Sequence, residues 1–401
     1  MKEEEGGCSS QKRRPYDPSI TAQWASLQPD LVQHIADCLL STSGVDEYMG
    51  MRAVCPSWRS SVAKPTPHAA VADLCFRPRQ WVLLNGADDD QGRPLFLHVT
   101  TGRFRRLRLP VLRDYILVGA SDGLLVLGDR DPPHAARLHN PLTGDMLPFA
   151  APIPLEPCLG TAVTGSEPTI IFSFEPRHGE YEDLPSYCSL QRGGRVVYSA
   201  DLTGQLRAVK FHDAAYNEEE LFFLLSMVTY AGNVYMLSAV GILYKIVRTG
   251  GHWYAERITE VYVRDKGALV ESAGKLLLVT EELDTFKVFR VDAKRKGLEP
   301  IKSIGSSALF LSHGKCLLVD TDKLPSIECN CIYTTICPGY RVDNIAVTYD
   351  LSDGKRKYIT SALGDGLGAQ SRHEAPLSLA QVLLSHCSEI DAQQDRICCQ
   401  I

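Results

Sequence analysis

Three closely spaced cysteines, Cys329, Cys331 and Cys337, are the one local cluster of cysteines in the sequence. A structural zinc site uses four ligands, usually as two closely spaced pairs. The second pair is missing here, and an unbroken strand would put all three cysteines on one face. We therefore interpret them as reduced cysteines of a protein interior, and we expect no metal.

Other sequence patterns with known chemistry are also missing. The chain contains no His-Glu-x-x-His and no phosphate-binding loop. The glycines of 364–368 lack the strand and helix that flank a dinucleotide site. We expect no catalytic residue and no cofactor.

The composition indicates a globular protein rather than a nucleic-acid binder. Hydrophobic residues make up 44% and charged residues 22%, and the formal net charge is −6, where a general nucleic-acid binder would be basic. The 13 cysteines are odd in number and follow a polar N-terminus, so we expect reduced thiols in the cytosol or nucleus. Cys398 has the position of a prenylated cysteine, but neither of the two middle residues, Cys399 and Gln400, is aliphatic, and an ordinary C-terminus is the favoured interpretation.

The uncharged segment 221–244 is long enough to cross a membrane as a helix. It contains a turn signal at 231–233 and β-branched and aromatic residues on both sides. Two buried strands joined by a hairpin fit this pattern better, and we expect no membrane contact.

Three short helices are predicted before residue 65. A helix beginning at Pro29 would carry Leu31, Ile35 and Leu39 on one face, since they recur every fourth residue. Two further helical patterns follow before residue 62. A unit of this size can bury little core of its own and favours packing on a partner.

The order of residues in this segment resembles the F-box motif. Its opening Leu-Pro-x-Asp-Leu stands here as residues 27–31, with Gln28 in place of the first proline. The resemblance implies binding to the Skp adaptor of a cullin-based SCF ubiquitin ligase. The residues implied in that contact are Leu27, Pro29, Leu31, Ile35, Leu39, Val54, Cys55, Trp58 and Arg59. The alternative is a helical cap on the larger domain, with the same apolar residues facing inward.

The remaining chain contains a repeated strand–turn–strand unit. Its turn glycines are Gly102, Gly144, Gly204, Gly250, Gly297 and Gly354. The five intervals from the first to the last average about 50 residues. Glycine at these positions would supply the positive φ of a tight hairpin.

A second repeated pattern, a glycine followed by an apolar run, lies between these turns, as in 121–129 and 272–281. Short strands with such a period predict a β-propeller of six or seven blades, with a β-sandwich as the competing all-β fold. The strand-like run 169–174 leaves a seventh blade as an alternative.

Residues 306–355 resemble the closing part of the domain in plant F-box proteins of the KIB type. Asn330, Ile332 and Tyr333 match one stretch, and the run 349–351 with Gly354 matches the next. With the F-box, the resemblance covers about residues 22–360. It implies the propeller fold and a receptor role, without naming a target.

The sequence therefore predicts an α+β multidomain chain. We expect a disordered tail at 1–20, a three-helix F-box at 21–65, an all-β propeller at 70–362, and a tail with a short helix at 363–401. The predicted function is substrate recognition in an SCF-type ubiquitin ligase, without catalysis by this chain. The alternatives are an adaptor-binding protein outside any ligase and an enzyme acting at the propeller centre.

Three acidic segments interrupt the strand pattern, at 87–92, 175–185 and 212–220. Our hypothesis is that some of them lie on the target-binding face and favour a basic partner. The alternative is that they are solvated loops without a binding role.

Overall fold

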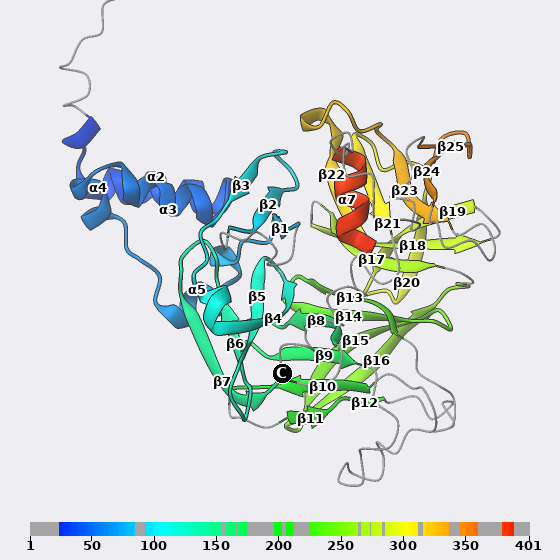
Figure 1. Cartoon of the computed structure of the whole chain (residues 1–401), viewed down its shortest axis with the longest axis horizontal. Coiled ribbons are helices and arrows are strands. Elements are labelled where there is room, and N and C mark those ends of the chain that lie inside the picture. Colours follow the sequence, from blue (N-terminus) through cyan, green and yellow to red (C-terminus); the bar gives the residue numbers. More distant parts are fainter. Residues whose placement is uncertain are drawn as a thin grey trace, which may run out of the picture. The chain divides into compact units, whose positions relative to one another are not determined.

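A computed structural model gives the fold of the chain. It describes residues 24–84, 93–153, 158–165, 167–174, 196–202, 206–211, 224–263, 266–272, 274–282, 285–311, 316–336, 345–359 and 379–388. The chain divides into two compact units, Met1–Lys64 and Pro65–Ile401. The first unit is helical in its described part, and the second is built mainly from strands (Figure 1).

The helical unit consists of α2 (Pro29–Thr42), α3 (Val45–Val54) and α4 (Pro56–Ser61). Pro29 and Pro56 occupy the first turns of their helices, where a missing N–H costs no hydrogen bond. Val32 and Ala36 of α2 are fully buried, as one face of the helix. The other buried apolar residues of the unit are Val45, Tyr48, Met51 and Val62.

The second unit begins with α5 (Pro67–Ala72) and η1 (Leu74–Phe76), and six sheets follow in the described residues. The first sheet contains β1 (Trp81–Leu83), β2 (Leu95–His98) and β3 (Phe104–Arg106). After α6 (Val111–Asp114), the second contains β4 (Tyr115–Ser121), β5 (Leu124–Asp129), β6 (Ala135–His139) and β7 (Met146–Pro152). The third contains β8 (Cys158–Val163), β9 (Ile170–Phe174), β10 (Val196–Ala200) and β11 (Leu206–Ala208).

The fourth sheet contains β12 (Lys210–Phe211), β13 (Leu224–Tyr230), β14 (Asn233–Ser238), β15 (Ile242–Thr249) and β16 (His252–Glu260). The fifth contains β17 (Gly267–Ser272), β18 (Lys275–Glu282), β19 (Thr285–Asp292) and β20 (Gly297–Ile301). The sixth contains β21 (Ser307–Leu311), β22 (Cys316–Asp320), β23 (Cys331–Ile336), β24 (Ile345–Asp350) and β25 (Arg356–Tyr358), with η3 (Thr321–Lys323) after β22.

Neighbouring sheets pack on one another in chain order, and the last packs on the first. Six clusters of buried apolar side chains lie one between each pair of consecutive sheets, the pair of sixth and first included. Strands pair antiparallel with their neighbours, except for the parallel pairs β12–β16 and β21–β23. This ring is a six-bladed β-propeller. The run 169–174, which the sequence left as a possible seventh blade, forms β9, a strand of the third blade.

Four of the predicted turn glycines have the expected left-handed backbone: Gly102, Gly144, Gly250 and Gly354. The prediction for Gly297 is wrong, because Lys296 takes the positive φ (53°) and Gly297 is the first residue of β20. In this turn the Asp292 carboxylate accepts hydrogen bonds from the N–H groups of Lys294 and Arg295, which fixes the loop without glycine at the left-handed position. Gly204 lies outside the described residues.

The apolar segment that could have crossed a membrane forms a hairpin. Its described residues, 224–244, contain β13 and β14, joined through Ala231 and Gly232, and the beginning of β15. None of the helices among the described residues is long and apolar enough to cross a membrane.

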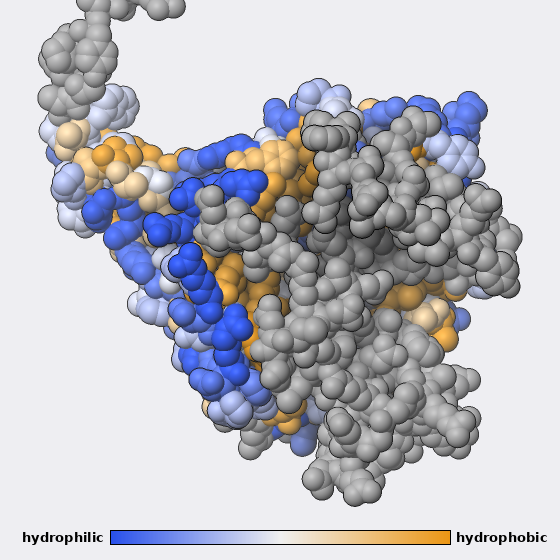
Figure 2. Space-filling view, in the orientation of Figure 1, coloured by the Kyte–Doolittle hydropathy of each residue, from blue (hydrophilic) through white to orange (hydrophobic). Residues whose placement is uncertain are grey.

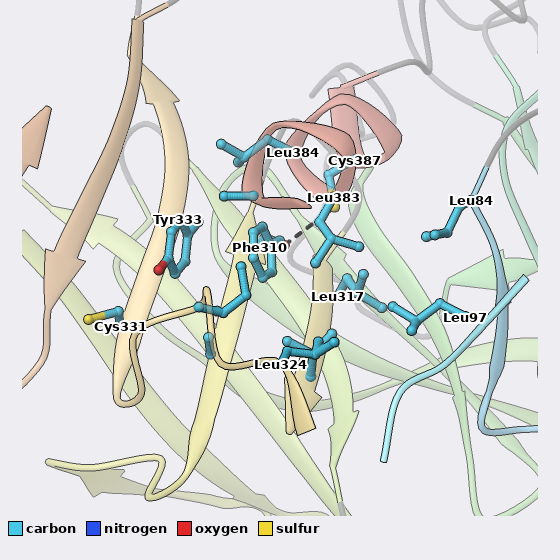
Figure 3. Close-up of a cluster of buried hydrophobic side chains, with 14 of the residues drawn as sticks. Leu84, Leu97, Phe310, Leu317, Leu324, Cys331, Tyr333, Leu383, Leu384 and Cys387 are labelled. Carbon is cyan, nitrogen blue, oxygen red and sulfur yellow. Dashed lines mark hydrogen bonds between the residues drawn. The ribbon is translucent and has the colours of Figure 1, made fainter. Parts of the chain in front are cut away.

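The last and first blades are joined through a C-terminal helix, α7 (Leu379–Ser388). Figure 3 shows Leu383, Leu384 and Cys387 of α7 packed toward Phe310 of β21, with Leu84 and Leu97 of the first blade in the same cluster. The Nδ1 atom of His386 lies 3.0 Å from the carbonyl oxygen of Leu84, and the Cys387 thiol donates to the carbonyl of Phe310 at 3.5 Å. The helix therefore belongs to the core that closes the ring.

Candidate functional site

The first helix of the N-terminal unit has two apolar faces. Val32 and Ala36 are completely buried within the unit, whereas Leu31 is 51% exposed and Ile35 is 38% exposed. Leu31 and Ile35 are four residues apart and lie on the same side of α2. The buried face holds the helix in its unit, and the outer face is free of that role.

Two more large apolar side chains of this unit are exposed, Trp24 at 58% and Val54 at 61%. In Figure 2 hydrophobic surface gathers over α2 and α3. We define the outer face of the helical unit as Trp24, Leu31, Ile35 and Val54. Exposed apolar groups gathered in this way are typical of protein-binding surfaces.

The other residues predicted for the adaptor contact differ in exposure. Leu27, Leu39, Cys55 and Trp58 are half-buried, and Pro29 and Arg59 are exposed. Trp58 is held in place by hydrogen bonds, because its indole N–H donates to the carbonyl of Trp24 at 3.0 Å. Its backbone N–H donates to the Sγ atom of Cys55 at 3.4 Å, which caps α4.

Backbone contacts made by three polar side chains fix α4 against α3. The Arg59 guanidinium donates to the carbonyl of Arg52 at 2.9 Å, and Arg52 donates in return to the carbonyls of Arg59 and Val62. The Tyr48 hydroxyl donates to the carbonyl of Ala63 at 2.7 Å. Arg59, which the F-box resemblance assigns to the adaptor contact, therefore has a structural task within the unit.

The sequence interpretation did not identify the inner face of α2. Val32 and Ala36 are also four residues apart, one position after Leu31 and Ile35, so their spacing carries the same signal. The pattern shows two neighbouring apolar stripes, and packing within the unit decides which is buried.

Two of the three clustered cysteines, Cys329 and Cys331, lie among the described residues. Within the part of the chain that the structure describes, no three His, Cys, Asp or Glu side chains are grouped so that they could hold a metal ion. Cys331 is buried at the start of β23, but Cys329 is exposed before the strand begins, so the interior interpretation is wrong for Cys329. Burial, with the carboxylates of Asp350 and Glu328 nearby, raises the pKa of Cys331 to about 11, which disfavours the thiolate that binds metals. Cys337 lies outside the described residues.

The propeller contains a buried ion pair near the start of its first blade. The Arg77 guanidinium lies 3.1 Å from the Asp122 carboxylate and also donates to the carbonyls of Val71, Thr164 and Gly165. Burial lowers the pKa of Arg77 and raises that of Asp122, and the attraction between the two charges opposes both shifts. Arg77 thereby ties η1 to the second and third blades.

Glu271, at the end of β17 in the fifth blade, is in electrostatic contact with this group. Burial raises the pKa of Glu271, the nearby charge of Asp122 raises it further, and Arg79 lowers it. Carboxyl groups with raised pKa values that converge from different blades are the feature by which a propeller enzyme would be recognised. Here Asp122 is engaged by Arg77 and is almost completely buried, so the group has a structural explanation.

Several predicted features lie outside the described residues. These are the tail 1–20, Cys398 and the acidic segments 87–92, 175–185 and 212–220.

The sequence profile of the KIB1-4 beta-propeller family matches residues 96–361. This range begins in β2 and ends just after β25, so it contains most of the propeller. A search of curated proteins finds no match to the chain.

Solved propeller structures resemble the chain at low identity. TolB from Acinetobacter baumannii is 15% identical, with 69% of this chain and 61% of that chain covered and a TM-score of 0.34. A putative 6-phosphogluconolactonase from Bacteroides uniformis is 12% identical, with coverage of 69% and 80% and a TM-score of 0.31. The acylaminoacyl peptidase of Pyrococcus horikoshii is 8% identical, with coverage of 64% and 44% and a TM-score of 0.33. The chain spans less than two thirds of TolB and of the peptidase, and scores this low carry no argument about function.

Proposed function

The chain belongs to the KIB1-4 β-propeller family, and from this premise we propose that it is the substrate-recognition subunit of an SCF-type ubiquitin ligase. The helical unit would bind a Skp-type adaptor, and through it a cullin. The propeller would bind a target protein on the loops and edges of its blades, as repeat scaffolds do. The chain would contribute proximity rather than catalysis, since holding two reactants together makes a slow bimolecular step effectively intramolecular.

The observation that supports this proposal is the exposure of Leu31 and Ile35 on a helix whose neighbouring apolar face is already buried. A helix that served as a structural cap would turn its large side chains inward. Burying a leucine or isoleucine that was exposed is worth about 1.5–3 kcal/mol. An adaptor that covers both side chains would therefore gain much of its affinity from these two positions.

The test is binding of the purified chain to a Skp-type adaptor, measured by calorimetry. Leu31→Ala and Ile35→Ala should each weaken binding by about 2 kcal/mol, roughly thirtyfold in Kd, because both remove apolar contact area. The melting temperature should stay the same, since both residues are exposed in the isolated chain. His34→Ala, an exposed polar position on the same helix, is the matched control and should bind like the unaltered chain.

Adaptor binding and ligase assembly are separate outcomes. A chain that binds the adaptor and then captures a cullin in the same purified complex acts as a ligase receptor. A chain that binds the adaptor without recruiting a cullin is an interaction protein outside the ligase. Absence of adaptor binding by the unaltered chain would refute both.

A further inference from the structure

The segment that leads from the first blade into the second has apolar side chains inward and arginines outward. Its apolar residues pack into the cluster between these two blades, and they are Leu107, Leu109, Val111 and Leu112. They anchor the stretch between β3 and the end of α6. The exposed arginines of the segment are Arg103, Arg105, Arg106, Arg108 and Arg113. Because the stretch is anchored in this way, its arginines are held at the surface of the protein. Figure 2 shows hydrophilic surface over β3.

One arginine of the second blade, Arg130, reaches the same place. It follows β5, and its Nε atom donates to the carbonyl of Arg113 at 3.2 Å, so its guanidinium lies beside α6. Arg130 is exposed as well. We define the arginine surface as Arg105, Arg108, Arg113 and Arg130. Arg103 and Arg106 already have interactions within the structure, and the arginine surface does not include them.

The arginine surface forms no ion pair with a carboxylate of the described residues. Asp114 and Asp131, each next to one of these arginines in the chain, are exposed and do not pair with them. Arg137 of β6 shows the contrast, because the carboxylate of Asp129 accepts two hydrogen bonds from its guanidinium. Four positive charges therefore face solvent beside two negative ones, and the surface is basic in a chain whose net charge is −6.

We propose that the arginine surface binds an acidic segment of a partner protein. A guanidinium group is planar and can hold a carboxylate through two parallel hydrogen bonds, which the ammonium group of lysine cannot do. Clusters of arginines recognise acidic motifs in other proteins through the same chemistry. Four such groups fit a segment in which glutamate or aspartate recurs, and their charge attracts the segment before contact is made.

The charge of the rest of the chain selects against nucleic acid. Without the arginine surface, the remaining residues are more acidic than the net charge of −6 of the whole chain. A nucleic acid would extend past the four arginines and meet a protein that repels it, whereas nucleic-acid binders have a basic excess. A short acidic segment does not extend so far. As the place where a ubiquitination target binds, the arginine surface rests on the proposed function; as a peptide-binding surface, it does not.

The experiment uses the full chain without adaptor and three labelled probes in fluorescence anisotropy. The first probe is a short peptide of alternating Glu and Ser, and the second is the same peptide with Gln in place of every Glu. The third is an oligodeoxythymidylate of the same charge as the first peptide. We expect saturable binding of the Glu peptide that weakens as salt is added. The Gln peptide should bind at least about tenfold more weakly, because it offers no charge to the arginines.

Variants of the chain locate the site. Arg108→Glu with Arg113→Glu should weaken binding of the Glu peptide at least about tenfold, because the surface loses its positive charge. The matched control is Lys275→Glu with Lys302→Glu, two exposed positions at strand ends of the fifth blade, and it should bind the peptide like the unaltered chain. Both double variants change the net charge equally, so a difference between them reports position. Circular dichroism and thermal melting establish that each variant is folded.

Three results would overturn the inference: equal binding of the two peptides, tighter binding of the oligonucleotide than of the Glu peptide, or equal effects of the two double variants. Adaptor binding is measured separately on the unaltered chain. Peptide binding by a chain that binds no adaptor supports the arginine surface and removes only its role in target recognition. Adaptor binding without peptide binding leaves the receptor proposal standing and ends this one.

Discussion

The helices α2 and α7 carry similar apolar patterns and have opposite environments. In α7, Leu383 and Leu384 are completely buried between the last and first blades. In α2, Leu31 and Ile35 lie on the outside of a helix that is already anchored by Val32 and Ala36. The comparison separates apolar residues that complete a fold from apolar residues that are left over when the fold is complete. The second kind is where a partner is expected.

The largest effect is expected in α7. Leu384→Ala should lower the free energy of unfolding by about 3 kcal/mol, because it removes a fully buried side chain from a packed cluster and leaves a cavity. The melting temperature of the propeller should fall in proportion. Adaptor binding at a temperature where the variant is folded should not change.

Val382→Ala provides the control in the same helix. Val382 is only half-buried, so its truncation should lower the free energy of unfolding by less than Leu384→Ala does. Equal stability of Leu384→Ala and the unaltered chain would mean that α7 is not part of the core that closes the ring, and the contrast with α2 would disappear.

A smaller loss is expected at the buried ion pair. Asp122→Asn keeps a side chain that tolerates the positive φ of this position (55°) and removes its charge, so Arg77 loses its charged partner. We expect a loss of about 2 kcal/mol in the free energy of unfolding, because hydrogen bonds between charged groups contribute about that much. Urea denaturation measures it. A change in adaptor affinity instead of stability would contradict the assignment of this pair to the propeller fold.

The two faces of α2 can be separated by neighbouring substitutions. Val32→Ala should destabilise the helical unit by about 1–2 kcal/mol, since it removes two buried carbon groups. Leu31→Ala should change stability by less than about 0.5 kcal/mol, as exposed positions usually do. Hydrogen exchange of the α2 amides reports the stability of this unit. Faster exchange in Leu31→Ala than in Val32→Ala would reverse the assignment of the faces.

The sequence predicts the blades well because their signals are local. Glycine turns, strand alternation and the hairpin at 224–238 depend on neighbouring residues, and the described part of the structure has them, with the exception of the turn at Gly297. Other features depend on residues far apart in the chain. Arg77 pairs with Asp122 over 45 positions, and His386 contacts Leu84 over 302 positions. Neither partner carries a local pattern that names the other, so these contacts could not be predicted.

The outer face of the helical unit could be predicted only in part. Spacing alone predicts that Leu31 and Ile35 share a face. Whether that face is buried depends on whether Val32 and Ala36 fill the interior first, which is a matter of packing. The exposed arginines of β3 lie in a segment that the sequence analysis interpreted only as a repeat unit, and their exposure follows from the strand being outermost.

The smallest effect is expected at Glu271, and it depends on pH. Its pKa is raised in the folded protein, by burial and then by the charge of Asp122. Between the unfolded and the folded pKa, the folded protein binds more protons than the unfolded chain. The free energy of unfolding therefore falls as pH rises through that interval, and the loss is complete above the folded pKa.

Glu271→Gln cannot ionise and escapes this loss. Relative to the unaltered chain, its melting temperature should rise as the pH is raised from below to above the ordinary pKa of a glutamate. Glu47→Gln is the control, because Glu47 lies in α3 of the helical unit, and it should show no such rise in propeller stability. A Glu271→Gln variant that loses relative stability as pH rises would mean that the carboxylate form stabilises the blade. Glu271 would then be a charged partner of Arg79.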